Sequence, residues 1–272
     1  MEYTFETNKE DTVLYKLNLQ PQKVLVTKNI ERLEERCFEE NTSLKEVIFE
    51  NGGTDTISSY CFYNCKNLKN VTLPDNLEVI HNGSFMGCKS LKNIVLPENL
   101  RTITHRAFCG SGLESITLPE SLKDVGRYAF AGCTSLSRVV FPKNMKVIEQ
   151  FAFYNCPSLE EIILPEGLTV IQENAFYCKD AHKVKYKTVS LPSTLEELSP
   201  SAFTPGTTLL LSSSQLKKFS FLKDPLCKVN YKVTQYKSED ITIDDLINSK
   251  NLDEFGLSLK ELNQVVLKNE ER

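Results

Sequence analysis

A short motif recurs about every 23 residues through most of the sequence. In each copy a small residue or Cys stands directly before a Phe, and successive Phe residues are 24, 23, 23, 22, 23, 23 and 27 positions apart. One repeat of this length cannot bury its own apolar face, so neighbouring repeats must supply the core. The spacing therefore predicts a solenoid of eight stacked rungs. The eight copies are Cys37-Phe38, Cys61-Phe62, Ser84-Phe85, Ala107-Phe108, Ala129-Phe130, Ala152-Phe153, Ala175-Phe176 and Ala202-Phe203.

Most repeats also carry a strand signature that ends at a proline. Segments such as Val71–Leu73 and Ile94–Leu96 alternate with the period of two that is typical of a short β-strand. Proline follows at once and marks the end of the strand, because it has no N–H to donate to a ladder. A second apolar pair, such as Leu77 and Ile80, then fits either a turn or a short second strand. We expect parallel strands, one from each rung, on the concave face of the solenoid.

The inward positions predict two buried ladders. The small residue of each motif lets neighbouring rungs approach closely, while the repeat Phe fills the interior. Asn or Gly two residues after the Phe favours a left-handed backbone, which we interpret as the end of a helical turn. These elements together predict an α/β repeat solenoid. The Phe ladder includes Phe85, Phe108, Phe130, Phe153 and Phe176, and the second ladder consists of Leu73, Leu96, Leu118, Phe141, Leu164 and Leu191.

The ends of the chain depart from the repeat and are interpreted as caps. Residues 1–22 form the predicted N-terminal cap, 23–205 the solenoid, and 206–272 a C-terminal cap with a strand over 207–213 and a helical tail from Asp240. A solenoid needs covered ends, since its terminal rungs have a neighbour on one side only. The long last spacing reflects an insertion around 182–187.

The repeat pattern L-x-x-I-x-L-P-x-x-L-x-x-I-x-x-x-A-F-x-x-C resembles the leucine-rich repeat of the BspA-like family. Residues 91–108 and 159–176 are near-complete copies, and the match covers roughly residues 23–205. The resemblance implies a leucine-rich repeat fold. It also implies adhesion and protein-binding roles at the cell surface or outside the cell.

Composition excludes several classes of function. Thirty-two basic against 36 acidic residues give a net charge of −4, which argues against a nucleic-acid partner. No apolar run approaches the ~20 residues of a membrane-spanning helix, so we expect no membrane insertion. The first ten residues lack a secretory signal, which favours a cytoplasmic protein, whereas the family resemblance implies a surface or secreted one. Localisation therefore stays open.

The chain offers little material for catalysis or metal binding. It has nine Cys, three His and no Trp, and no Cys or His spacing typical of a zinc site. Four Cys stand three residues after the repeat Phe, where structural packing is the favoured interpretation and disulfides between neighbouring rungs are the alternative. They are Cys65, Cys88, Cys133 and Cys156. No catalytic triad, phosphate loop or nucleophile elbow is present. We expect no enzyme, no metal site and no cofactor.

The outward residue at the centre of each main strand is the candidate contact with a partner. Five of these eight residues are apolar, although a solvated sheet face should alternate toward polar residues. Strand propensity explains such residues equally well, and a partner-binding stripe is the competing hypothesis. The eight residues are Leu25, Ile48, Thr72, Val95, Thr117, Val140, Ile163 and Ser190.

Charged residues flank this stripe and change sign along the chain. They run from basic to acidic, which would orient a bound partner. The six residues are Lys69, Lys92, Glu114, Arg138, Glu160 and Glu161. The sequence thus predicts a non-enzymatic module that binds an unidentified protein through its concave sheet, in adhesion or surface interaction. The alternative is an intracellular scaffold or regulatory interaction module.

Overall fold

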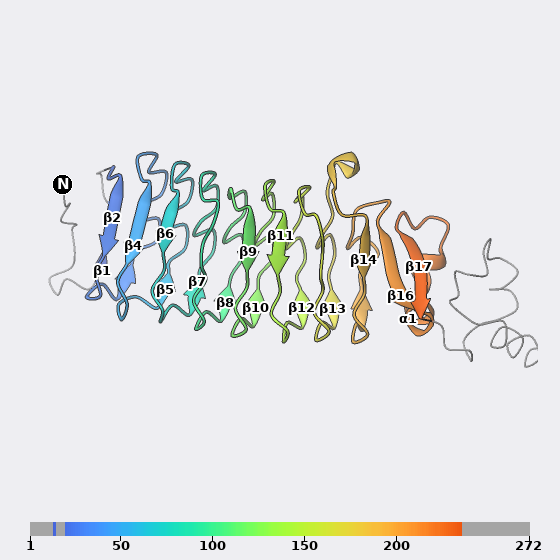
Figure 1. The fold of residues 1–272 in the computed structure, drawn as a ribbon. Helices are drawn as coiled ribbons and strands as arrows, with labels where there is room; N and C mark the ends of the chain where they lie inside the picture. The colour runs from blue at the N-terminus through green and yellow to red at the C-terminus, as the bar shows by residue number, and fades with distance from the viewer. Residues whose placement is uncertain (1–12, 15–19, 236–272) are drawn as a thin grey trace, which may run out of the picture.

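The computed structural model describes residues 13–14 and 20–235, which form one row of coils stacked side by side (Figure 1). Each coil is one repeat and is called a rung below. Each rung contributes a segment to a main sheet and, about ten residues later, a two-residue strand to a second sheet. The chain is therefore a parallel β-solenoid with little helix. The expected repeat solenoid is confirmed.

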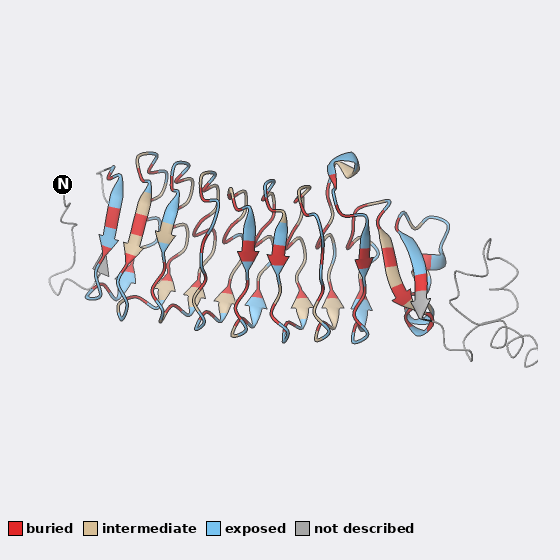
Figure 2. Ribbon diagram, in the orientation of Figure 1, coloured by how far each residue is buried: buried red, intermediate tan, exposed pale blue. Residues whose placement is uncertain are grey.

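The main sheet is built from eight strands that fall into three hydrogen-bonded groups. They alternate in burial where the period-two pattern predicts it, for example exposed-buried-exposed along β9, β11 and β14 (Figure 2). The eight are β2 (Lys23–Val26), β4 (Glu46–Phe49), β6 (Asn70–Thr72), β9 (Ser115–Thr117), β11 (Arg138–Val140), β14 (Thr188–Ser190), β16 (Thr208–Ser212) and β17 (Asn230–Gln235).

The second sheet consists of strands of two residues each, and it settles the turn-or-strand alternative in favour of strands. Each described strand from β3 to β15 in this sheet buries its second residue, such as Ile80 and Ile103. These strands are β1 (Val13–Leu14), β3 (Arg32–Leu33), β5 (Thr56–Ile57), β7 (Val79–Ile80), β8 (Thr102–Ile103), β10 (Asp124–Val125), β12 (Val147–Ile148), β13 (Val170–Ile171) and β15 (Glu197–Leu198).

The pairing is parallel and its register follows the repeat. Residue 25 lies opposite residue 48, and residue 48 lies opposite residue 72. Similarly, Ile57 lies opposite Ile80 and Ile80 opposite Ile103. Because equivalent positions of successive rungs lie opposite one another, a sequence column of the repeat is a column in space.

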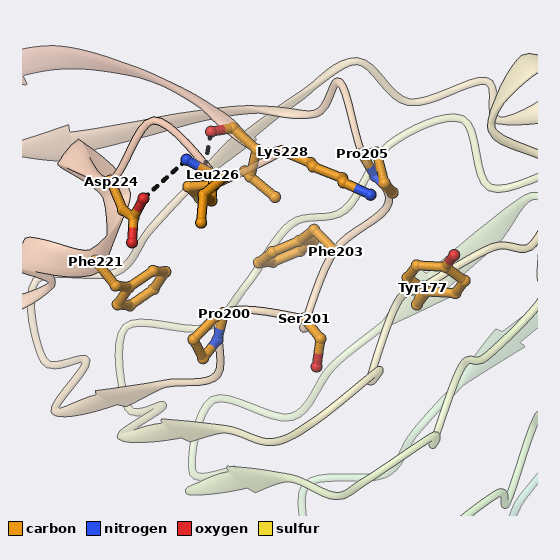
Figure 3. A pocket seen from close by; sticks show the side chains of 11 residues that line it. Tyr177, Pro200, Ser201, Phe203, Pro205, Phe221, Asp224, Leu226 and Lys228 are labelled. Atoms are coloured by element: carbon orange, nitrogen blue, oxygen red, sulfur yellow. Dashed lines mark hydrogen bonds between the residues drawn. The ribbon is translucent and has the colours of Figure 1, made fainter.

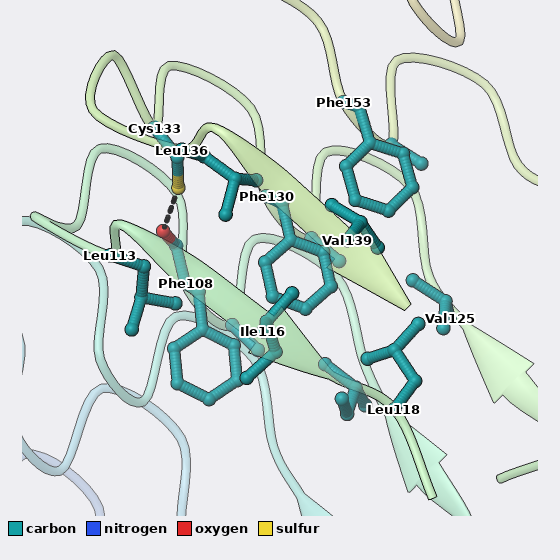
Figure 4. Close-up of a cluster of buried hydrophobic side chains, with 14 of the residues drawn as sticks. Phe108, Leu113, Ile116, Leu118, Val125, Phe130, Cys133, Leu136, Val139 and Phe153 are labelled. Atoms are coloured by element: carbon teal, nitrogen blue, oxygen red, sulfur yellow. Dashed lines mark hydrogen bonds between the residues drawn. The ribbon is translucent and has the colours of Figure 1, made fainter. Parts of the chain in front are cut away.

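The repeat Phe residues form one continuous stack through the interior, and Figure 4 shows Phe108, Phe130 and Phe153 as part of it. Seven successive pairs have ring centroids 5.2–5.4 Å apart and planes within 12° of parallel. The stack begins at Phe38 and ends at Phe203, and five of its rings are among the largest fully buried side chains. Offset aromatic stacking adds to the apolar area that each ring removes from water. The predicted Phe ladder is confirmed.

The second predicted ladder is buried at five of its six positions. Leu73, Leu96, Leu118, Leu164 and Leu191 belong to the core, whereas Phe141 is only partly buried. The Phe141 ring packs edge-on against Phe153, with centroids 5.5 Å apart. The ring is larger than the leucines of the same column, so part of it stays outside. The expectation of full burial at this position is wrong.

The segment around each repeat Phe consists of tight turns, where a helical turn was expected. In the second rung the N–H groups of Cys61 and Tyr63 donate three residues back, to Ser58 and Tyr60, while the N–H of Phe62 donates to Ser84 of the next rung. In each of the six rungs from Phe38 to Phe153 two residues adopt a left-handed backbone, here Tyr60 at φ 55° and Asn64 at φ 54°. The predicted left-handed position two after the Phe is therefore correct, and a second one lies four residues earlier.

The parallel stacking continues past residue 205 into the predicted C-terminal cap. Strand β16 pairs with β14 and then with β17, and it confirms the strand expected over 207–213. The described helices are α1 (Ser213–Lys218), with a capping box of Ser212 and Gln215, and the 3-10 turns η1 (Ala181–Lys183) and η2 (Ser220–Lys223). Turn η1 lies in the predicted insertion. The predicted helical tail and most of the N-terminal cap lie outside the described residues.

Candidate partner-binding face

The outward residues of the main sheet form one column across the solenoid, and we call this surface the main-sheet face. The register places Leu25, Ile48 and Thr72 opposite one another in this column, and it places Thr117 opposite Val140. It also extends the column beyond the predicted set, because Ser190 lies opposite Leu210, and Leu210 opposite Lys232. The strand over 207–213 was visible in the sequence, but its outward residues were missed because the repeat motif had ended.

Four apolar side chains of this column are exposed. Val95 is 85% exposed, Ile163 64%, Leu25 44% and Val140 38%. Thr72, Thr117 and Ser190 are also exposed, whereas Ile48 is intermediate. The eight residues of the predicted stripe therefore face away from the core, with Ile48 the most covered of them.

The two most exposed apolar residues lie where the main sheet is interrupted. Residues 93–96 and 161–164 form no strand, so the prediction of a strand at Ile94–Leu96 is wrong, and the two segments separate the three groups of the main sheet. Val95 lies in the first of these segments and Ile163 in the second. At two places on the main-sheet face, a large exposed apolar side chain therefore lies on a segment that belongs to no strand of the main sheet.

The six flanking charges occupy two neighbouring columns instead of one. Arg138 lies opposite Ser115 within the sheet, so Glu114 stands one residue before the column that contains Arg138. The N–H of Lys69 bonds the carbonyl of Lys45, its counterpart one rung earlier. By the repeat, Lys92 and Glu160 share the column of Lys69 and Glu114, whereas Glu161 shares the column of Arg138. The repeat pattern alone does not separate these two columns, because all six residues stand just before a predicted strand.

Opposite charges of this flank pair across rungs. The Lys92 ammonium lies 2.8 Å from the Glu114 carboxylate, and Lys185 lies 3.0 Å from Glu160. The Glu114 carboxylate raises the pKa of Lys92 by a hydrogen bond and by its charge. Such exposed pairs are worth little in stability and are screened by salt. Their pairing weakens the predicted basic-to-acidic gradient, which stays a prediction.

The cysteine column has a structural role. The thiols of Cys65, Cys88, Cys133 and Cys156 each donate to the carbonyl of the repeat Phe one rung earlier, at Sγ–O distances of 3.0–3.1 Å. Figure 4 shows this bond between Cys133 and Phe108. All nine cysteines lie in the described part of the chain, and none of them forms a disulfide. Packing, the favoured interpretation, accounts for the column.

Burial makes these thiols poor nucleophiles. It raises the pKa of Cys65 and of Cys133 to about 12, and it raises the pKa of Cys88 and Cys156 well above the ordinary value. A thiol reacts and binds metal as the thiolate, which burial disfavours. The column therefore supplies no reactive group at neutral pH.

The described residues offer no other chemical centre. Among them, no three His, Cys, Asp or Glu side chains gather as metal ligands would. The His105 ring packs edge-on against Tyr128, and burial together with Arg106 and Arg127 lowers its pKa. Within the same part of the chain no helix is long and apolar enough to cross a bilayer. The main-sheet face thus remains the candidate site.

Comparisons with known proteins agree with this architecture. A crystal structure of a leucine-rich repeat protein from Bacteroides ovatus aligns with a TM-score of 0.62 at 23% identity, over 89% of this chain and 69% of that one. The leucine-rich repeat protein of T. pallidum aligns with a TM-score of 0.55 at 27% identity, over 62% of this chain and 83% of that one. No curated protein matches the sequence significantly.

The family model of the BspA type leucine rich repeat region, which contains six copies of the repeat, matches residues 10–126 and 103–218. These two overlapping matches cover most of the chain and include every rung of the Phe stack. The match agrees with the resemblance of the repeat motif and with the fold of the solved structures. The chain belongs to the BspA-type leucine-rich repeat family.

Proposed function

We propose that this chain is a non-enzymatic protein-binding module that docks a partner on its main-sheet face, in adhesion or surface interaction. The observation that carries the proposal is the exposure of Val95 and Ile163, at 85% and 64%, on a face where the sheet is interrupted. Burying two such side chains on binding stabilises a complex by roughly 3–6 kcal/mol before the costs of association.

Strand propensity is the competing explanation, and it does not account equally well for these two residues. β-Branched side chains favour strands because they pack against cross-strand neighbours on a pleated surface. Val95 and Ile163 are so exposed that they gain little from such packing. A partner that covers both segments would bury the side chains and use backbone groups outside the ladder.

The test is capture of partners from the native source with the full chain and with the double variant Val95→Asp plus Ile163→Asp. Both positions are solvent-exposed and outside the ladder, so the variant should keep the fold. Two carboxylates in the interface should weaken binding about a hundredfold. Circular dichroism and the urea midpoint show whether the fold is intact.

The matched control is Ser135→Asp plus Asn144→Asp. It adds the same two charges at exposed positions outside the outward column of the main sheet. The control should bind like the wild type. If both double variants bind equally well, or lose binding equally, the main-sheet face is not the docking surface.

A second candidate is an intracellular scaffold or regulatory module that uses the same face. The observation that favours it is the thiol column, because each of its four bonds to a Phe carbonyl requires a reduced, protonated cysteine. Reduced thiols are typical of intracellular compartments. Fractionation of the native source, with alkylation of free thiols before and after reduction, distinguishes this candidate from a surface protein.

A further inference from the structure

A column of charged residues beside the second sheet is divided into an acidic half and a basic half. The column consists of the residue seven positions before the repeat Phe in each of the first six rungs, and all six residues are exposed. Each of them directly precedes a strand of the second sheet, and we call this set the charge column. In rung order its members are Glu31, Asp55, Glu78, Arg101, Lys123 and Lys146.

Neighbouring members of the charge column lie side by side. The N–H of Glu78 donates to the carbonyl of Asp55, and the N–H of Arg101 donates to the carbonyl of Glu78. The N–H of Lys123 in turn donates to Arg101. Lys146 lines the same cavity of about 490 Å³ as Lys123. Since parallel strands lie ~4.8 Å apart, the column runs about 24 Å across the six rungs.

The division into two halves is unfavourable within a single chain. Like charges directly opposite one another on neighbouring strands repel. Opposite charges meet only where the halves join, at Glu78 and Arg101, whose charged groups lie 3.8 Å apart. Within the described part of the chain, no ion pair neutralises Asp55, Lys123 or Lys146. Stability of the fold alone favours alternating signs, so the order of the signs indicates a partner of opposite polarity.

A second copy of the chain has this polarity. When two copies pack their charge columns together in antiparallel directions, with a two-fold axis between the third and fourth rungs, every acidic residue meets a basic one. A two-fold contact of this kind forms each pair twice. The pairs, with one residue from each copy, are Glu31 with Lys146, Asp55 with Lys123, and Glu78 with Arg101.

We propose that two copies of this chain form an antiparallel two-fold dimer through the charge column. The outward residues beside the axis are Val79 and Thr102, which are opposite each other in the sheet, uncharged and partly exposed. Their short side chains let the two columns approach closely. The contact is separate from the main-sheet face, so each copy keeps that face free for the proposed partner.

The other charges of the second sheet are compatible with this arrangement. The two-fold axis brings one pair of like charges together, Glu34 and Glu149, but the Glu34 carboxylate is already paired with Arg32 at 2.7 Å. The remaining charged residues from the charge column to the position four residues later meet uncharged residues of the second copy. They are Arg32, Glu35, Asp124 and Arg127.

The size of the contact predicts a weak dimer. The strip that meets the second copy is about 24 Å long and about 13 Å wide. Its area of roughly 300 Å² per copy is well below the ~800 Å² of a standard stable interface. Charge pairs therefore supply most of the attraction, and salt should disperse the dimer.

The C-terminal coils stay outside the contact, because the overlap ends at the sixth rung. They contain a mostly apolar pocket of about 390 Å³, with Phe221 and Leu226 in its wall (Figure 3). The carboxylate in the wall, Asp224, accepts a hydrogen bond from the N–H of Leu226 at 2.8 Å. The pocket thus offers no column of charges to a second copy.

Sedimentation equilibrium of the full chain provides the first test. At about 0.05 M salt, the wild type should change from monomer to dimer as its concentration rises from roughly 5 to 500 µM. At about 1 M salt it should be a monomer throughout. A monomer at every concentration overturns the proposal, and so does a dimer that high salt leaves intact.

A charge swap provides the second test. Lys123→Glu and Asp55→Lys each place like charges opposite one another in the dimer, so each variant alone should dimerise at least about tenfold more weakly. An equimolar mixture of the two variants should dimerise like the wild type. In the mixed dimer the introduced carboxylate meets the introduced ammonium, and the native pair forms at the other site. Both substitutions relieve repulsion within their own column, so both variants should fold.

Two control variants accompany the swap. Lys66→Glu makes the same change of net charge at an exposed residue outside the strip and should dimerise like the wild type. Val95→Asp plus Ile163→Asp should also keep the dimer, because those residues belong to the main-sheet face. Equal losses in Lys66→Glu and Lys123→Glu, or a mixture that stays monomeric, contradict the antiparallel pairing. Loss of the dimer in the main-sheet variant overturns the proposal, since the two copies then meet through that face.

Discussion

The ring of Phe130 lies parallel to the ring of Phe153, with 5.3 Å between their centroids and 2° between their planes. The two residues are 23 positions apart in the sequence, yet each fills the space directly beside the other. Because this relationship recurs from Phe38 to Phe203, each ring between these two ends contributes to the burial of both its neighbours.

Phe130→Ala should lower the free energy of unfolding by about 3–5 kcal/mol, since a fully buried ring in a tight stack leaves a cavity. Urea denaturation followed by circular dichroism measures the loss. Tyr154→Ala is the matched control, because that ring is only half-buried and lies outside the stack. Tyr154→Ala should lower the free energy of unfolding by less than half as much as Phe130→Ala. Equal losses for the two variants would mean that the stack does not carry the core.

Gly112→Ala should destabilise the protein by more than about 2 kcal/mol, because overpacking against backbone cannot relax easily. A Cβ at residue 112 would lie 2.0 Å from the Lys89 carbonyl oxygen of the preceding rung. Gly110→Asn is the control: residue 110 has φ +66° and open space, and Asn64 and Asn155 hold the same column at similar φ. It should cost less than about 1 kcal/mol. The urea midpoints compare them, and a larger loss at 110 would refute the close rung contact.

Alkaline pH should destabilise the protein through its buried thiols. Burial raises the pKa of Cys133 from 9.0 to about 12, so the folded state keeps a proton that the unfolded state releases. The corresponding stability is complete below pH 9 and is lost as the pH rises from 9 toward 12. Between pH 8 and 11, Cys133→Ser should therefore lose about 2 kcal/mol less unfolding free energy than the wild type.

The measurement is a series of urea titrations at pH 8, 9, 10 and 11 on both proteins. Serine can still donate to the Phe108 carbonyl, so the variant should fold normally at pH 8. Cys227→Ser is a control at a partly exposed thiol. Parallel pH profiles for wild type and Cys133→Ser would show that this thiol is not buried as described.

The sequence predicts the interior of this fold well because the interior repeats. A column such as Phe85, Phe108 and Phe130 is visible at fixed spacing, and stacking one repeat on the next brings its members together. The outward position of Val95 and Ile163 follows from the same period. Their role in binding does not follow, because strand propensity and partner binding select the same residue types.

The sequence does not predict the features that depend on backbone geometry within a rung. Tyr60, Arg106 and Phe151 adopt a left-handed backbone although their residue types disfavour it. The N–H groups of Tyr60, Arg106 and Phe151 bond carbonyls of the next rung, so the stack of coils overrides local preference. These hydrogen bonds between neighbouring rungs also produce tight turns where a helical turn was expected. The partial exposure of Phe141 likewise depends on packing that no single repeat reveals.

The most direct test of the main-sheet face is hydrogen–deuterium exchange on the full chain, free and bound to a captured partner. Residues 93–96 and 161–164 lie outside the ladder, so their amides should exchange rapidly in the free protein. Binding should slow exchange in both segments and leave strands β7, β8, β12 and β13 of the second sheet unchanged. Protection confined to the second sheet, or absent from both main-sheet segments, would contradict the proposed docking surface.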